Sequence, residues 1–324
     1  MKLATLNSGH PRDGQLVVVS SDGSHCLAPE SVHTLQDALE NWPNAEKECR
    51  VLEEQLANGM GTPIDSTLFM APLPRAWQWL DGSAFDNHGD LMQKAFNHEP
   101  LQREKPLMYQ GMSHRFYGPY DRIPFPREED GIDFEAEFGV IVDDVPMGTS
   151  ADEALSHIKL LVMINDWSLR HLAIPEMNTG FGWIQAKPAC SMAPFAVTPD
   201  EAGNAWKDGR LHLDLAVSWN DEPFGHPNGR EMSVGFHELI AHAAATRDLC
   251  AGTVIGSGTV SNANYRETGS TCISERRGIE IIDHGKPATA YMKFGDRIHM
   301  QTCHPDSTSL FGTIDQQVTS GLCN

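Results

Sequence analysis

The chain has 324 residues, of which 40% are hydrophobic, so it can bury a substantial core as one large and one small domain or as two domains. Its 24 basic and 44 acidic residues give a net charge of −20, which argues against nucleic acid or an anionic membrane as a partner. No apolar stretch approaches the roughly 18 residues of a membrane span, and residues 1–6 lack a signal peptide's apolar core. The seven cysteines are scattered, without a Cys-x-x-Cys pair, and we therefore expect a reducing, cytoplasmic location.

Residues 1–70 form a distinct opening region. An apolar run at residues 16–19 predicts a strand, a turn follows at residues 21–23, and two helical patterns cover residues 35–42 and 49–56. Gly59, Gly61 and Pro63 mark the end of this region. We predict a small N-terminal domain over residues 1–70 and a larger domain over residues 71–324.

Strand and turn patterns dominate the larger region, and they predict a mixed α+β, strand-rich fold. Residues 211–219 alternate between apolar and polar side chains, Asn220-Asp221 marks a turn, and residues 236–249 give the clearest helical pattern. Residues 279–282 and 289–292 flank Asp283-His284-Gly285-Lys286, which we interpret as a hairpin.

Acidic residues alternate along the strand predicted over residues 133–142. Asp133, Glu135 and Glu137 share one face of that strand, and the two glutamates lie roughly 7 Å apart. Carboxylates this close in a partly buried place repel each other, so they either take up protons or share a cation. A solvated acidic face at the edge of a sheet is the alternative.

A further acid follows the apolar run at residues 158–164, which predicts a buried strand. That strand ends at Asn165-Asp166, and functional groups often gather where strands open toward solvent. Asp166 is therefore a candidate third ligand. The alternative is that Asp166 caps a helix that begins at Trp167.

Several catalytic motifs can be discounted. His237 and His242 are five residues apart, which places them about 140° from each other on a helix and does not suit zinc. The sequence has neither a Gly-x-Ser-x-Gly nucleophile motif nor a Gly-x4-Gly-Lys-Ser/Thr phosphate loop. The glycine-rich residues 252–259 fit a strand and a turn whose backbone approaches a ligand.

A set of spaced motifs points to one family. Asp81 and His88 are seven residues apart, and Asp-x-Glu-x-Glu follows at residues 133–137. Asn-Asp-Trp-Ser-x-Arg occupies residues 165–170, Lys187 comes later, and Gly-Thr-x-Ser occupies residues 258–261. In this combination the sequence resembles the fumarylacetoacetate hydrolase family over about residues 70–305. The resemblance implies a β-roll catalytic domain preceded by a small N-terminal β-containing domain.

The resemblance implies a metal-dependent hydrolase that cleaves a carbon–carbon bond in a 1,3-diketo acid such as fumarylacetoacetate, in the breakdown of aromatic amino acids or other aromatic compounds. It also implies that the cation is Mg²⁺ or Ca²⁺, with Mn²⁺ also compatible, because an all-carboxylate set suits a hard cation. The implied ligands are Asp81, Glu135, Glu137 and Asp166.

The resemblance also assigns roles to the other residues. His88 would activate water, with Glu275 orienting its ring, while Arg170 and Lys187 would stabilise an oxyanion or bind the substrate's carboxylate. Thr259 and Ser83 would contact the substrate. From the residues alone, His88 could equally be a surface residue on a helix, Arg170 a capping or ion-pairing residue, and Lys187 an ordinary loop lysine.

Three positions depart from the animal-type fumarylacetoacetases. Asn97 lies where those enzymes have an arginine, and Ala173 and Met177 lie where they have glutamine and tyrosine. The substrate therefore stays open, and an acylpyruvate hydrolase, a 2-oxo acid decarboxylase or a hydratase are alternatives. A non-catalytic divalent-cation-binding protein is an alternative of another class. By the same resemblance we expect a homodimer.

Overall fold

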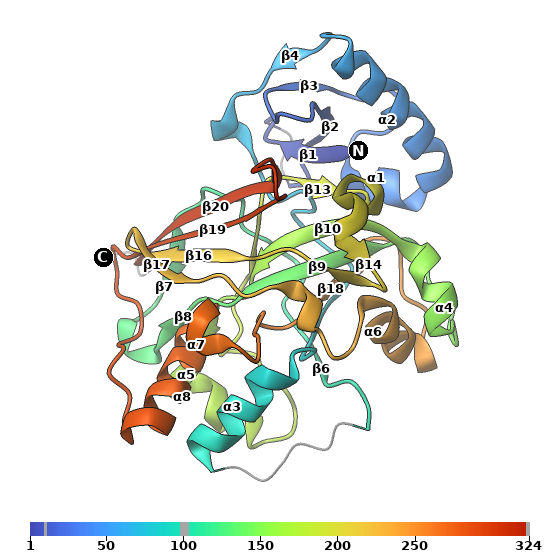
Figure 1. Ribbon diagram of the computed structural model, residues 1–324. Helices are drawn as coiled ribbons and strands as arrows, with labels where there is room; N and C mark the ends of the chain where they lie inside the picture. The colour runs from blue at the N-terminus through green and yellow to red at the C-terminus, as the bar shows by residue number, and fades with distance from the viewer. Residues whose placement is uncertain (10–11, 98–103, 322–324) are drawn as a thin grey trace.

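The computed structural model describes residues 1–9, 12–97 and 104–321. Within this part of the chain, eleven strands form a central sheet, and another five form a second sheet (Figure 1). The central sheet runs in the order β4 (Thr62–Pro63), β3 (His25–Leu27), β2 (Gln15–Val19), β1 (Lys2–Leu6), β13 (Ala196–Val197), β10 (Ile158–Asn165), β9 (Ala136–Val142), β18 (Val254–Gly256), β5 (Trp79–Gly82) and β6 (Met108–Gln110), and β12 (Ser191–Met192) pairs with β10.

The second sheet and the helices complete the larger region. The sheet runs in the order β17 (Glu222–Gly225), β16 (Ala216–Trp219), β19 (Arg297–Cys303), β20 (Ser309–Ser320) and β7 (Ile123–Phe125). Two short ladders pair β8 (Ile132–Asp133) with β11 (Ser168–Leu169) and β14 (Trp206–Lys207) with β15 (Arg210–Leu211). The α-helices are α1 (Leu35–Glu40), α2 (Trp42–Ala57), α3 (Asp86–Phe96), α4 (Ala151–Ala154), α5 (Arg170–Met177), α6 (Phe236–Ala243), α7 (Tyr265–Thr268) and α8 (Ile273–His284).

The predicted mixed α+β, strand-rich class is confirmed, and the N-terminal region has its own helical layer. Thr34 accepts a hydrogen bond from the N–H of Asp37, which in turn accepts one from the N–H of Thr34, so a capping box starts α1. Helices α1 and α2 lie over strands β1 to β3 (Figure 1), and Leu35 and Leu39 join Leu16 in one core cluster. Strand β1 pairs with β13, so this region extends the central sheet.

Two local predictions turn out differently. The predicted strand at residues 133–142 is interrupted between β8 and β9. The hairpin predicted around residues 283–286 is wrong, because residues 273–284 form α8. Gly285 has a φ of 76° at the end of α8, and a glycine in the left-handed region is a common helix terminator. In contrast, the turn predicted at Asn220-Asp221 is confirmed between β16 and β17, where both residues have positive φ.

The centre of the larger sheet determines where functional side chains can meet. Strands β5 and β9 lie on either side of β18, and β10 lies beside β9. At the other end of the molecule from α1 and α2, Figure 1 shows α3, α5, α7 and α8 together. Among the described residues, no helix is long and apolar enough to cross a membrane.

Candidate metal centre

Three carboxylates, carried on or directly after three strands of the central sheet, meet in the interior. Asp81 lies on β5, Glu137 on β9, and Asp166 directly after β10. Asp81 is 5% exposed and the other two are fully buried. One oxygen of each carboxylate lies within 4.8 Å of one oxygen of each of the others. We call these three residues the acidic triad.

The acidic triad is electrostatically unfavourable without a cation. Burial, together with the charge of Asp166, raises the pKa of Asp81 well above its usual value. Burial, and then the charge of Asp81, does the same to the pKa of Glu137. Among the described residues, Oε1 of Glu137 is buried without a hydrogen-bond partner. A divalent cation would satisfy this oxygen and neutralise the repulsion, so the residues present fit a hard metal ion.

Backbone geometry brings an amide to the acidic triad. The N–H of Gly258 donates to Oδ1 of Asp81 and to Oε2 of Glu137, each at 3.2 Å. Gly258 has a φ of 77°, and a Cβ there would collide with the carbonyl oxygen of Gly82. Only glycine therefore allows the turn after β18 to approach the carboxylates this closely.

Glu135, the fourth predicted ligand, lies beside the acidic triad but contacts cations. Its Oε1 accepts hydrogen bonds of 2.6 Å from Lys187 Nζ and from the hydroxyl of Ser168, and it lies 3.0 Å from Nη2 of Arg170. Burial alone would raise the pKa of Glu135, but the charges of Arg170 and Lys187 hold it below its usual value. The structure therefore groups three of the four predicted ligands and places the fourth against two basic side chains.

Lys187 connects Glu135 to the acidic triad. Its Nζ also donates to Oδ2 of Asp166 at 2.6 Å. Burial alone would lower the pKa of Lys187, but the charges of Asp166 and Glu135 raise it above its usual value. Lys187 is therefore a buried cation rather than a solvated loop lysine, and it neutralises part of the acidic charge.

Asp166 has two further partners that the sequence reasoning missed. The hydroxyl of Tyr109 donates to its Oδ2 at 2.7 Å, and the thiol of Cys190 donates to its Oδ1 at 3.0 Å. The alternative in which Asp166 caps a helix is wrong, because α5 begins only at Arg170, after its cap residue Leu169. Tyr109 comes from β6, and no local pattern connects it to residue 166.

His88 and Glu275, from two helices, form a pair outside the acidic triad. His88 lies in the first turn of α3, six residues after the end of β5, and Glu275 lies in the first turn of α8. Nδ1 of His88 is 2.8 Å from Oε2 of Glu275. The carboxylate is fully buried, whereas the histidine side chain is 19% exposed. The histidine ring is therefore partly open to solvent, while the contact with Glu275 fixes its orientation.

Comparison with known proteins identifies the family. The C-terminal domain of fumarylacetoacetate hydrolase matches residues 78–319, and fumarylacetoacetase N-terminal domain 2 matches residues 1–75. The chain belongs to the fumarylacetoacetate hydrolase family.

Relatives of this chain are named for different activities. A 2,4-didehydro-3-deoxy-L-rhamnonate hydrolase of Sphingomonas sp. (strain SKA58) is 26% identical over 277 residues, which cover 82% of this chain and 84% of the relative. A mitochondrial oxaloacetate tautomerase of Bos taurus is 23% identical over 80% of this chain and 81% of its own length. A maleylpyruvate hydrolase from Sphingobium sp. SYK-6, solved with manganese(II) and pyruvate, has a TM-score of 0.66 at 15% identity, over 99% of this chain and all of that one. The last comparison shows the shared fold.

In this member of the fumarylacetoacetate hydrolase family, Asp133 links Arg170 to the start of α8, the helix that carries Glu275. Its Oδ1 accepts the N–H of Ile273 at 2.8 Å and its Oδ2 that of Ser274 at 2.9 Å, at the start of α8. Oδ2 also accepts a hydrogen bond from Nε of Arg170 at 2.7 Å. Asp133 therefore holds both the helix that carries Glu275 and the arginine that faces Glu135. The Asp-x-Glu-x-Glu motif of the family indicates in the sequence that Asp133 matters. The motif does not indicate the hydrogen-bond partners of Asp133, because they lie far away in the sequence.

The two residues predicted to contact substrate lie in different surroundings. Thr259 is buried, and its hydroxyl donates to Oε2 of Glu135. Ser83 is exposed and lines a cavity of about 210 Å³ with Lys105 and Ser233. The structure thus places Thr259, but not Ser83, in direct contact with the acidic residues.

Replacing Gly256 with alanine should disrupt the acidic triad. A Cβ at this position would collide with the indole of Trp79 and with the carboxylate of Asp81. We expect the free energy of unfolding to fall by about 1–3 kcal/mol, the usual cost of overpacking, and metal-induced stabilisation to disappear. Thermal melts with and without Mn²⁺ measure both effects.

Gly278→Ala is the matched control for Gly256→Ala. Its Cβ would meet the flexible end of Met92, and alanine is favoured inside α8. This variant should keep the full metal response. If Gly256→Ala also kept it, the close packing of the acidic triad against β18 would not matter for the cation.

Proposed function

We propose that the protein is a divalent-cation-dependent hydrolase that cleaves a carbon–carbon bond in a 1,3-diketo acid, fumarylacetoacetate or an acylpyruvate. The observation that carries the proposal is the buried acidic triad in one site with a buried cation, Lys187, and a partly buried one, Arg170. The His88–Glu275 pair supplies a proton acceptor in the same region of the fold. We also propose that this reaction belongs to aromatic catabolism and that the enzyme is a cytoplasmic homodimer.

Asp81, Glu137 and Asp166 would hold the cation, with Glu135 as the fourth ligand that the sequence predicts. Carboxylate oxygens suit Mg²⁺, Ca²⁺ or Mn²⁺ better than a soft metal. The bound cation would polarise the carbonyl groups of the substrate.

His88 would act as the general base. Glu275 accepts a hydrogen bond at Nδ1, which leaves Nε2 of the neutral ring free to take a proton from water. The resulting hydroxide attacks the carbonyl carbon, the bond to the neighbouring carbon breaks, and its electron pair remains on the leaving enolate. The proton held at Nε2 can then return to that carbon, so the histidine ends the cycle neutral.

Lys187 and Arg170 would bind the anionic parts of the substrate. Nζ of Lys187 uses two of its three hydrogens on Glu135 and Asp166, and the third remains for a substrate oxygen. In the described part of the chain, Nη2 of Arg170 makes no hydrogen bond although it lies near Glu135. Both groups could therefore donate to an oxyanion or a carboxylate without losing their structural contacts.

A tautomerase is the second candidate, favoured by the relative of that activity that covers 80% of the chain. Moving a proton between carbon and oxygen would use the same cation and the same base, without attack by water. Product analysis separates the two reactions, because a hydrolase yields two acids and a tautomerase yields an isomer.

The decisive experiment follows the ultraviolet absorbance of fumarylacetoacetate and a panel of acylpyruvates. The purified protein is first freed of metal and then supplied with Mg²⁺, Mn²⁺ or Ca²⁺. We expect metal-dependent loss of absorbance with two acid products from one panel member. We also expect the cation to raise the melting temperature, because a ligand at 100 times its Kd stabilises a protein by about 2.7 kcal/mol.

Other outcomes would redirect the assignment. An isomeric product would favour the tautomerase, and loss of CO₂ or addition of water would favour the decarboxylase or the hydratase. A raised melting temperature without turnover of any panel member would favour a non-catalytic cation-binding protein. Light scattering on the same sample tests the homodimer.

A further inference from the structure

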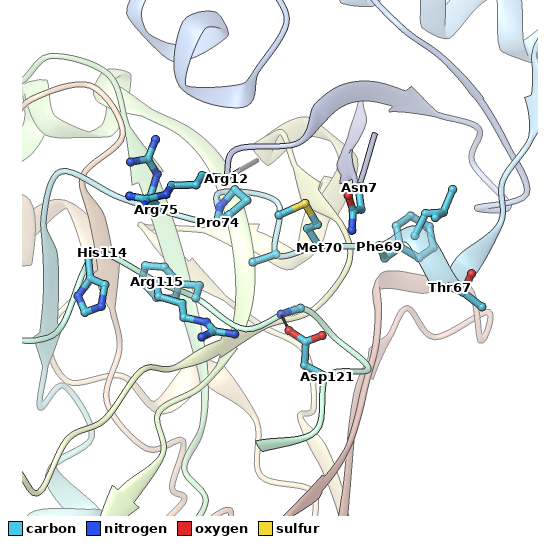
Figure 2. Close-up of a pocket in the computed structure, with 14 residues that line it drawn as sticks. Asn7, Arg12, Thr67, Phe69, Met70, Pro74, Arg75, His114, Arg115 and Asp121 are labelled. Carbon is cyan, nitrogen blue, oxygen red and sulfur yellow. Dashed lines mark hydrogen bonds between the residues drawn. The ribbon is translucent and has the colours of Figure 1, made fainter. Parts of the chain in front are cut away.

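A second cavity of about 610 Å³ lies between the N-terminal region and the loop that joins β6 to β7. We call it the seam pocket, and Figure 2 shows its lining. The N-terminal region contributes Arg12, the segment that follows it contributes Arg75, and the loop contributes His114 and Arg115. No residue of the acidic triad belongs to its described lining, so it is separate from the candidate metal centre.

The seam pocket is cationic in a chain with a net charge of −20. Three arginines and one histidine line it, whereas Asp121 is the only acidic side chain in the described lining. One oxygen of Asp121 accepts the N–H of Gly118 at 2.9 Å. A cationic cavity in so acidic a protein would concentrate small anions.

Arg12 and Arg115 have guanidinium groups available for a ligand, whereas the third arginine is paired. Arg75 pairs with Asp13, to which its Nε donates at 2.7 Å. Arg115 lies over the ring of Tyr117, 4.3 Å from its centre, which leaves its N–H groups free to donate. Within the residues that the structure describes, neither Arg12 nor Arg115 has a carboxylate partner. Guanidinium groups of this kind recognise carboxylates through paired hydrogen bonds.

The basic side chains lie in two groups within the cavity, and apolar side chains form part of the remaining lining. In Figure 2, Arg12 and Arg75 lie together, while His114 and Arg115 lie below them. Phe69, Met70, Pro74 and Phe116 also line the cavity. This arrangement suits a ligand with an acidic group at each end of a short carbon chain, and the volume is typical of a small-molecule site.

We propose that the seam pocket binds a small organic dicarboxylate. One carboxylate contacts Arg12, beside the Arg75–Asp13 pair, and the other contacts Arg115 and His114. The apolar side chains of the lining contact the carbon chain between them. This proposal does not depend on the proposed hydrolase activity, because it concerns binding at a separate cavity.

Titration calorimetry of adipate into the full chain, without added metal and at constant ionic strength, tests this site. We expect saturable binding of adipate and none of adipamide, its uncharged analogue. Arg12→Gln with Arg115→Gln should weaken the binding of adipate at least tenfold. Both side chains are exposed, so the double variant should fold normally, which its melting temperature checks.

Arg297→Gln is the matched control, because it removes an exposed arginine on β19 that pairs with Asp315 outside the seam pocket. This variant should bind adipate with unchanged affinity. Unchanged affinity in the double variant would overturn the proposal, since the dicarboxylate would then bind elsewhere, for example at Lys187 and Arg170. Equal binding of adipamide, or no binding of adipate, would overturn it as well.

Discussion

Replacing His88 with asparagine should lower the turnover of the diketo-acid substrate by about 10²–10⁴-fold, the usual contribution of a general base. Asparagine keeps a polar side chain at the start of α3 but cannot accept a proton from water at neutral pH. His88 is not a member of the acidic triad that would hold a cation, so the metal-induced rise in melting temperature should persist. Initial rates with saturating cation, together with melts of the same samples, measure the two effects.

Two further variants sharpen the test of His88. Glu275→Gln keeps an acceptor for Nδ1 of His88 but removes the buried charge that stabilises a protonated ring, so we expect a smaller loss of turnover. His284→Asn, at the other end of α8, should leave turnover unchanged. Full activity of His88→Asn would remove this residue from the mechanism and favour a reaction that does not need this base.

Strand signals in the sequence locate two members of the acidic triad, Glu137 on one predicted strand and Asp166 at the end of another. Residues 158–164 are apolar almost throughout, as expected for a strand buried on both faces, and Asp166 follows that strand directly. The resemblance added Asp81 and the late Glu275, whose contact with His88 spans 187 residues. No local pattern could have joined residues so far apart in the chain.

Other features could not be predicted, because they depend on tertiary contacts. The chain between Asp133 and Ala136 leaves one ladder and joins another, so Asp133 turns toward α8 instead of sharing a strand with Glu137. Tyr109 and Cys190 reach Asp166 from separate strands or loops. The short apolar run at residues 279–282 fits a strand as well as a helix, and its packing in α8 decides between them. The domain boundary near residue 70 stays a prediction.

Replacing Glu137 with glutamine should separate the two roles of the acidic triad. Glutamine has nearly the same shape, and its amide oxygen can still accept the N–H of Gly258. The substitution removes a buried carboxylate that lies near Asp81 and Asp166, so the metal-free protein should melt at the same temperature as the parent or higher. Metal-induced stabilisation should disappear, and turnover should fall to the background rate. Paired melts with and without Mn²⁺ measure this reversal.

Asp130→Asn is a suitable control for Glu137→Gln, because Asp130 is also a buried carboxylate but pairs with Arg127. Removing its charge leaves Arg127 without that partner, so the metal-free protein should lose stability while the response to Mn²⁺ persists. The two variants should therefore change the metal-free melting temperature and the metal response in different ways. If Glu137→Gln instead destabilised the metal-free protein and kept its response to Mn²⁺, the buried carboxylates would be structural, and the cation would have to bind elsewhere.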